Sequence, residues 1–535
     1  MTTLAGFLNV VLRGVGLAGL ATALGGVAYA LLVLRPFAAP SRLRNAAVGR
    51  CLTLIAAGAI LLAGAQALIL GLQPLALAGE NGSAPFRAFF STTFAQAGLA
   101  RIALAIALAV TAILLRRTPD SRASWWAAAG LAVLLGMNAA WLSHAMGRLE
   151  YREVLMALEV FHQVAAAVWV GGLIHLVAFS LLRRDSSEEA EASGFAARFS
   201  SVALGSVAGL VAAGIALSLF YVDGVDGLLG TGYGIMILTK VAVLAGALAL
   251  AALNFLAVRR MSRRGGAVPA SLWWFVEAEV GMGVTLLLAA AALTSLPVAA
   301  DVREDRATLA EVGSRFVPKL PSFSTPRIGD LLAAAAPITD TLAERKQPEY
   351  QWSEFNHHVA GLFVFSMGLL ALIELGGRSR WARHWPLLFL GLAAFLFLRN
   401  DPRAWPLGPA GFWETMLLPD VLQHRLAVAL IVALAAFEWA VRTGRLRARG
   451  WAYVFPLLCA AGGALLLTHS HALFNLKAEF LIEVTHAPLG VLAVFVGWGR
   501  WLELRLPAPN NRVPGHVWAV AFTMVGALLL FYREG

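Results

Sequence analysis

The feature that most constrains this 535-residue chain is a series of apolar runs, each long enough to cross a lipid bilayer. A helix rises about 1.5 Å per residue, so about 20 apolar residues span the ~30 Å hydrocarbon core. We count fourteen such runs, at residues 11–34, 50–73, 95–115, 124–144, 154–182, 200–220, 233–258, 272–297, 355–375, 384–398, 416–440, 451–469, 479–498 and 515–532. A helix pairs its own backbone polar groups, as hydrocarbon requires. The sequence therefore predicts an all-α polytopic transmembrane helix bundle whose solvent is the lipid bilayer.

The composition agrees with a membrane protein, since 59% of the residues are hydrophobic and 14% are charged. The net charge of +11 comes largely from arginines in short loops between the runs, which we interpret as topology signals and not as a nucleic-acid site. Cys51 and Cys459 lie inside apolar runs, far apart, so neither a disulfide framework nor a thiolate metal site is indicated. The N-terminus lacks a basic region followed by a cleavage site, so the first run is expected to be a retained span.

The loops predict an orientation and a domain organisation. Every second loop is rich in arginine, whereas the loop at 221–232 has no cation. Because cytoplasmic loops carry the excess of Arg and Lys, both termini are expected on the outer side, the periplasm of a bacterium, with the protein in the inner membrane. We predict an eight-span domain at 1–298, a periplasmic linker loop at 299–353 with a possible amphipathic helix at 328–344, and a six-span His-rich domain at 354–535.

A hairpin at residues 141–173 contains the first candidate site. His144 is expected at the outer end of one span, followed by Met146, and Glu159 and His162 lie three residues apart in the next span, on one helical face. Ionisable groups at that depth are costly and mark functional sites, although each could also be an interfacial polar residue. Imidazole with a thioether suits copper better than magnesium or calcium. The hairpin therefore predicts a copper site facing the periplasm.

The same hairpin resembles the CopD copper-resistance family. The similarity rests on Ser143-His144-Ala145, on F-H-x-x-A-A-A-x-W-x-G-G at 161–172, and on the stretch at 232–254, and it extends over about residues 10–298. The resemblance implies an inner-membrane protein that imports or delivers copper, with His144 and His162 as copper ligands. Lys240 and Glu277 lie within later spans at different depths, so we expect a structural role or a place on a transport path instead of a direct pair.

The C-terminal half is predicted to repeat this hairpin in the same orientation. Residues 158–162 (LEVFH) parallel residues 482–486 (IEVTH), and the spacing of 18 residues from His144 to His162 parallels 17 from His469 to His486. Further polar side chains are expected at the same outer level. The predicted second metal site comprises His357, His358, His424, His469, His471, Glu483 and His486, with Asp420 beside His424 in a structural or transport role. Gln423-His424 is weakly similar to CtaG-like oxidase assembly proteins, but this half is assigned to no family.

Three functions remain open from the sequence. The first is a copper-binding protein that takes up or transfers copper, as Cu(I) or Cu(II), from the periplasmic side. The second is a redox protein with haem b, held by His358 with His424 or by His471 with His486, that passes electrons or reduces the metal. The third is a copper-delivery factor for oxidase assembly, with a periplasmic copper chaperone or an oxidase subunit as its partner. No P-loop or nucleophilic triad is found, so no enzyme activity is expected, apart from a possible metal reductase.

Overall fold

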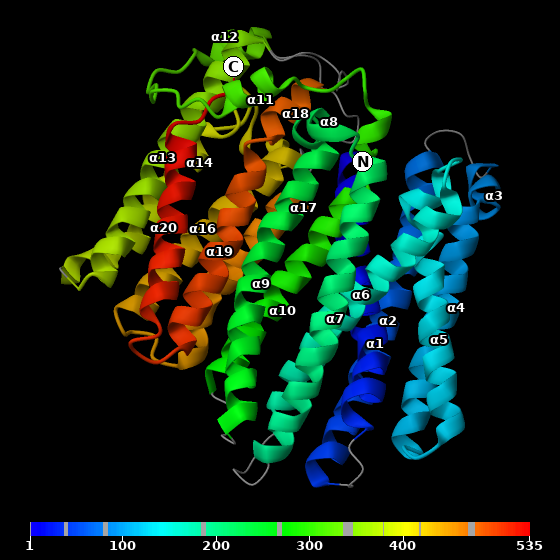
Figure 1. The fold of residues 1–535 in the computed structure, drawn as a ribbon. Coiled ribbons are helices and arrows are strands. Elements are labelled where there is room, and N and C mark those ends of the chain that lie inside the picture. Colours follow the sequence, from blue (N-terminus) through cyan, green and yellow to red (C-terminus); the bar gives the residue numbers. More distant parts are fainter. Residues whose placement is uncertain are drawn as a thin grey trace. The chain divides into compact units, whose positions relative to one another are not determined.

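A computed structural model describes residues 2–36, 41–78, 84–182, 189–264, 270–334, 346–377, 379–416, 419–468 and 477–534 (Figure 1). Within these ranges the chain is helical and forms no strand, apart from one isolated bridge between Ala404 and Ala410. Fourteen of the described helical segments are long and apolar enough to cross a membrane. The predicted all-α polytopic bundle and its number of spans are therefore confirmed.

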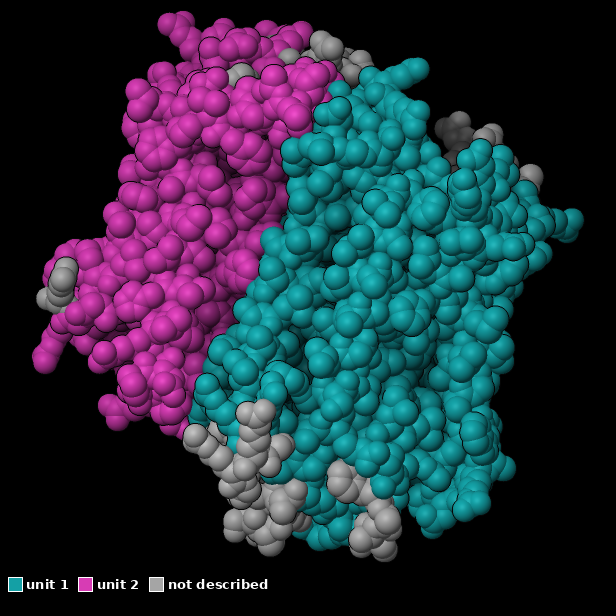
Figure 2. Space-filling view, in the orientation of Figure 1, with its two compact units in different colours: residues 1–306, 467–475 teal, residues 307–466, 476–535 magenta. Residues whose placement is uncertain are grey.

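The chain divides into two compact units, residues 1–306 with 467–475 and residues 307–466 with 476–535 (Figure 2). The helices of the first unit are α1 (Thr2–Tyr29), η1 (Ala30–Leu34), α2 (Arg42–Ala78), α3 (Ala84–Phe90), α4 (Thr93–Arg117), α5 (Arg122–Ala140), η2 (His144–Gly147), α6 (Arg152–Ser180), α7 (Glu189–Tyr221), α8 (Gly224–Leu229), α9 (Gly232–Arg264), α10 (Ala270–Leu293) and η4 (Ala299–Asp301).

The second unit begins within the predicted linker loop. Its helices are α11 (Leu309–Arg315), α12 (Ile328–Ala334), α13 (Gln347–Leu375), η5 (Arg380–Leu387), α14 (Leu388–Arg399), α15 (Phe412–Thr415), α16 (Pro419–Arg442), η6 (Arg449–Tyr453), α17 (Val454–Thr468), α18 (Lys477–Glu483), α19 (His486–Arg505) and α20 (Arg512–Leu530). The tenth span, which was predicted as the shortest, combines η5 and α14 into 20 residues.

In the first unit, α1 packs along α2, α6 and α10. Its crossing with α6 depends on glycine: a Cβ on Gly171 would lie 1.9 Å from the Ala21 carbonyl oxygen, and one on Gly25 would lie 2.2 Å from that of Ala167. Small residues of this kind let membrane helices approach closely. Gly171 belongs to the glycine pair that ends the motif at 161–172. Helix packing therefore explains this part of the motif, because the glycine lets α6 pack closely against α1.

The part of the linker loop that belongs to the second unit is attached to the helices of that unit. Thr308 and Glu311 form a capping box at the start of α11, and the Glu311 carboxylate pairs with the Lys477 Nζ of α18 at 2.7 Å. Farther along, the Lys319 backbone N–H donates to the Phe531 carbonyl oxygen at 3.1 Å. Of the predicted helix at 328–344, α12 covers the first seven residues, and 335–345 lie outside the described residues.

The ion pair between α11 and α18 is expected to weaken in acid. Hydrogen bonds from Lys477 and then from Thr308 lower the pKa of Glu311 to about 2, from an ordinary value of 4.5. Because the folded-state pKa is depressed, the contact is fully present above about pH 4.5 and is lost as the pH falls toward about 2. Hydrogen exchange of the α11 amides, corrected for intrinsic rates and compared at about pH 5 and pH 3, should show this loss. Glu311→Gln should remove the pH dependence, and an unchanged dependence in that variant would contradict the assignment.

Candidate metal sites

His144 lies in the turn between α5 and α6, in the short helix η2. The Ser143 hydroxyl caps η2 by accepting from the Ala145 N–H at 3.3 Å. The half-buried His144 ring has its Nε2 3.4 Å from the Leu293 carbonyl oxygen and meets the Tyr233 ring edge to face, with ring centroids 6.0 Å apart. Burial lowers the pKa of His144 below its ordinary value, assisted by the positive charges nearby. His144 is therefore held as the neutral imidazole, the form that can bind a metal.

Glu159 and His162 lie in α6, which runs without a break through both positions, as predicted. The Nδ1 of His162 is 3.0 Å from the Leu210 carbonyl oxygen of α7. A carbonyl oxygen can only accept, so Nδ1 carries the proton and Nε2 is the nitrogen with a lone pair. The ring packs over Gly214, where an added Cβ would lie 3.1 Å from Cε1. This hydrogen bond fixes the tautomer and the ring orientation in the way that is usual for metal-binding histidines.

A lysine joins these side chains. Lys240 of α9 is within coulombic range of both Glu159 and His162, and the Glu159 carboxylate also accepts from the Gln163 amide at 3.3 Å. Lys240 and Glu277 were predicted not to form a direct pair, and the acid within electrostatic range of Lys240 is Glu159. The unit thus places the Lys240 amine within electrostatic range of a carboxyl and an imidazole of α6.

Sequence reasoning missed three residues around this cluster. Tyr221 and Tyr233 pack edge to face, with ring centroids 6.3 Å apart, and both are within coulombic range of Glu159. The Tyr221 hydroxyl is buried without a hydrogen-bond partner among the described residues. Met236 is buried in the same core cluster. Tyrosines at the ends of apolar runs are typical of the interfacial belt, so the sequence offered no signal that these were buried.

Glu277 was the acid singled out in the eighth span, but the fully buried acid is its neighbour Glu279. Glu279 is 3% exposed and accepts a short hydrogen bond from the Asn254 side-chain amide of α9, whereas Glu277 is only half-buried. Side chains that are two residues apart on a helix point in directions that differ by about 200°. An acid at either position fits the apolar run equally well, so the sequence could not tell which would face the interior.

In the second unit, His357 of α13 and His486 of α19 meet. Their ring centroids are 5.8 Å apart, and His357 stacks on Tyr532 at 4.0 Å. The Nδ1 of His357 is 2.8 Å from the Ser353 carbonyl oxygen, and that of His486 is 3.0 Å from the Ile482 carbonyl oxygen, so both rings carry the proton on Nδ1. Two imidazoles that bind one ion through Nε2, at about 2 Å each, have centroids roughly 5–6 Å apart, so this spacing is compatible with a shared ion.

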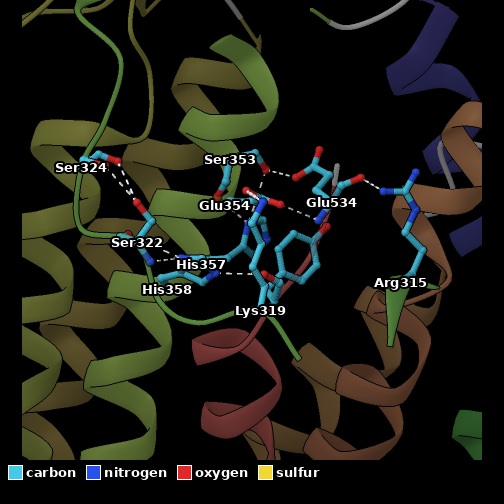
Figure 3. A network of polar contacts seen from close by, with 10 residues as sticks. Arg315, Lys319, Ser322, Ser324, Ser353, Glu354, His357, His358 and Glu534 are labelled. Carbon is cyan, nitrogen blue, oxygen red and sulfur yellow. Dashed lines mark hydrogen bonds and ion pairs between the residues drawn. The ribbon is translucent and has the colours of Figure 1, made fainter. Parts of the chain in front are cut away.

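His358, one residue farther along α13, is a structural crosslink (Figure 3). It is fully buried, its Nδ1 accepts from the Ser322 N–H at 3.0 Å, and its Nε2 donates to the Tyr532 carbonyl oxygen at 2.9 Å. The adjacent Glu354 accepts from Lys319 Nζ at 2.6 Å and from the Glu534 N–H at 3.1 Å. Both His358 nitrogens are therefore engaged by the backbone, and this histidine has none to offer a metal or a haem iron.

Two of the remaining candidates, His424 and Met146, are described by the structure. His424 pairs with Asp401 at 2.9 Å, and Met146 is half-buried in η2. His469, His471 and the side chain of Asp420 lie outside the described residues. No group of three or more His, Cys, Asp or Glu side chains that could hold a metal ion is found among the residues that the structure describes. The haem alternative, which needed His358 with His424 or His471 with His486, gains no support.

The backbone around the Glu-His pair differs between the two halves. Glu483 ends α18 and His486 begins α19, with a turn at 484–485, so the two residues do not share a continuous helix as Glu159 and His162 do. Pro488 explains the break, because a proline supplies no N–H to the carbonyl four residues earlier and is tolerated only in the first turn of a helix. Thr485 keeps right-handed helical dihedrals and residues 480–505 form one apolar span, so the turn interrupts the helix without ending the span, and the predicted repeat of the hairpin stays a prediction.

These features define a polytopic all-α membrane protein with a half-buried His162 near Glu159 and Lys240 in the first unit and a pair of imidazoles in the second. Residues 193–293 match the family model described as Copper resistance protein D. The chain is also 29% identical over 239 residues to Copper transport protein CutJ of Bacillus subtilis (strain 168), an alignment that covers 43% of this chain and 43% of that relative. No solved structure matches the chain significantly. The predicted resemblance to the CopD family is thereby confirmed, over residues 193–293 of the predicted range, and the chain spans less than half the length of the curated relative that it matches.

Proposed function

We propose that this protein binds copper as a cargo ion in the first unit and transfers it across the membrane through His144, Glu159 and His162. One observation carries the proposal: His162 is oriented by the Leu210 carbonyl of α7 so that its lone pair is on Nε2. Leu210 and Lys240 both lie within the stretch that matches Copper resistance protein D. The segment similar to a copper-related family thus positions the candidate ligand.

Ligation in this unit would be sparse and sequential. The described residues form no site of three or more ligands, and a carrier must release its ion as well as bind it. His144 is neutral in the turn and His162 lies deeper along α6, so the ion would pass from one imidazole to the next. Glu159 would partly compensate its charge, and Met146 or Met236 would add the soft ligand that Cu(I) favours.

Lys240 should oppose the binding of a cation at this place. A unit charge about 7 Å from the ion costs on the order of 2 kcal/mol at an effective dielectric constant of about 20, equal to roughly 30-fold in affinity. Lys240→Gln should therefore bind copper about tenfold or more tightly in a chelator competition titration. Lys240→Arg, which keeps the charge, is the matched control. Equal copper affinity in the two variants would show that the ion does not bind near Lys240.

We further propose that His357 and His486 bind a second ion at the outer end of the second unit. Their centroid separation and the shared tautomer support this pair. By the distribution of arginines, both sites would face the periplasm of a bacterial inner membrane. A periplasmic copper chaperone would then be the donor of the ion, or an oxidase subunit its recipient. We propose no catalytic turnover for the chain.

Copper flux into proteoliposomes tests the proposed function. The full chain is reconstituted with a copper-sensitive chelating dye inside, and Cu(I) is added outside. We expect dye signal above that of protein-free vesicles, and its loss in His162→Ala. If the reconstituted protein binds copper but moves none, transport is wrong and delivery to an oxidase partner becomes the better account.

A further inference from the structure

The first unit contains a cavity that the copper sites do not use. Helices α6, α7, α9 and α10 line a partly open cavity of about 270 Å³. The walls are largely apolar and include Trp169, Leu204 and Phe255, and the polar lining side chains are Ser200, Asn254 and Glu279. A concave, mostly apolar space with a few polar groups has the composition of a small-molecule site.

The polar end of this cavity holds an unsatisfied acceptor. Asn254 is 9% exposed, and its Nδ2 donates to the Glu279 carboxylate. Its Oδ1 is buried and has no hydrogen-bond partner among the described residues. This hydrogen bond to the Glu279 carboxyl oxygen orients the amide and leaves Oδ1 as its remaining acceptor. Buried polar atoms are almost always paired, and the described part of the chain supplies no donor to this acceptor, so a bound molecule with a donor group could pair with it.

The cavity is reached from the bilayer. Leu204 and Phe255 line it and are also 58% and 37% exposed, and both lie within membrane-spanning segments, 191–221 and 232–260. An occupant would therefore enter from the lipid phase. The volume of about 270 Å³ is just below the usual range for ligand sites, which suits one chain or one ring instead of a two-chain phospholipid.

We propose that this cavity binds a single-chain membrane amphipath whose head group carries a hydroxyl or N–H donor. The donor binds Asn254 Oδ1, Glu279 acts as the positioning residue that orients the amide, and the chain lies along the apolar walls toward Leu204. A monoacyl lipid, a long-chain alcohol and an isoprenoid quinol share this chemistry. The proposal does not depend on copper binding.

Photolabelling of the full chain tests the proposal. The protein is reconstituted in phosphatidylcholine vesicles with a diazirine-bearing dodecanol, and labelled peptides are mapped by mass spectrometry. We expect labels on the cavity-lining parts of α7 and α9. Unlabelled dodecanol should compete about tenfold better than dodecyl methyl ether, which has the same chain but lacks the donor.

Three variants make the test specific. Asn254→Leu should remove the preference for the alcohol over the ether, because the acceptor is gone. Ala203→Trp should fill the cavity and abolish labelling, whereas Ala208→Trp, on the lipid-facing side of the same helix, should leave it intact.

Equal competition by alcohol and ether in the unmodified protein would overturn the proposal, as would a preference that persists in Asn254→Leu. If Ala203→Trp fails to fold, the comparison of alcohol and ether in Asn254→Leu still tests the proposal. Decyl hydroquinone as a further competitor separates the sources: better competition than dodecanol supports a quinol, and weaker competition supports a monoacyl lipid or alcohol.

Discussion

His162→Ala is expected to reduce copper affinity at the first-unit site by about 100-fold or more. Losing only a second-shell partner of a metal ligand costs about 10–100-fold, and this substitution removes the ligand itself. The side chain lies over Gly214, so truncation leaves the α6–α7 contact without a clash. The measurement is a Cu(I) titration of the purified full chain against a competing chelator.

The matched control is His175→Gln in the same helix. His175 is buried, its Nε2 donates to the Thr22 carbonyl oxygen at 2.9 Å, and a glutamine amide can make the same donation. This variant should keep the unmodified copper affinity. If His162→Ala binds as tightly as His175→Gln, His162 is not a ligand and the proposed path through α6 fails.

His358→Ala is expected to destabilise the second unit by about 3–5 kcal/mol. The substitution removes two buried hydrogen bonds, at about 1–3 kcal/mol for each partner left unpaired, and opens a cavity beside them. The loop at 319–322 and the C-terminal segment at 531–534 would lose the attachment to α13 that they share at His358, and only the one at Glu354 would remain of the two described here (Figure 3). Hydrogen exchange should show both segments opening, together with a lower unfolding temperature.

His516→Ala serves as the control for that experiment. His516 is exposed on α20, and its Nδ1 donates to the Arg512 carbonyl oxygen at 2.7 Å. A surface substitution of this kind changes the free energy of unfolding by about 0.5 kcal/mol or less. Unchanged exchange in His358→Ala, within the range of the His516→Ala control, would show that His358 does not hold the loop and tail together.

The spans were predictable because an apolar run is a local property, and the length a bilayer requires is fixed by physics. The same argument from an apolar run predicted that Glu159 and His162 share one uninterrupted helix, as they do in α6. The different roles of His357 and His358 did not. The two adjacent histidines differ by about 100° around α13, and only the folded positions of the 319–322 loop and the C-terminal segment make one a crosslink and the other a neighbour of His486.

The buried tyrosines show a second limit. Tyr221 and Tyr233 end and begin apolar runs, where tyrosine usually marks the membrane interface. They face Glu159 and His144 because α7 and α9 bring the two run ends together around the turn at η2. That contact depends on helix packing between separate spans, which the pattern within each span does not encode.

The central claim, that copper is the ion bound by these imidazoles, is tested most directly by elemental analysis with an absorption spectrum. The full chain is purified in detergent after growth with added copper. We predict about one copper ion or more per chain, reduced in both His162→Ala and His486→Ala, with no Soret band. A strong Soret band with iron and little copper would contradict the account and make the imidazole pair of the second unit a haem site.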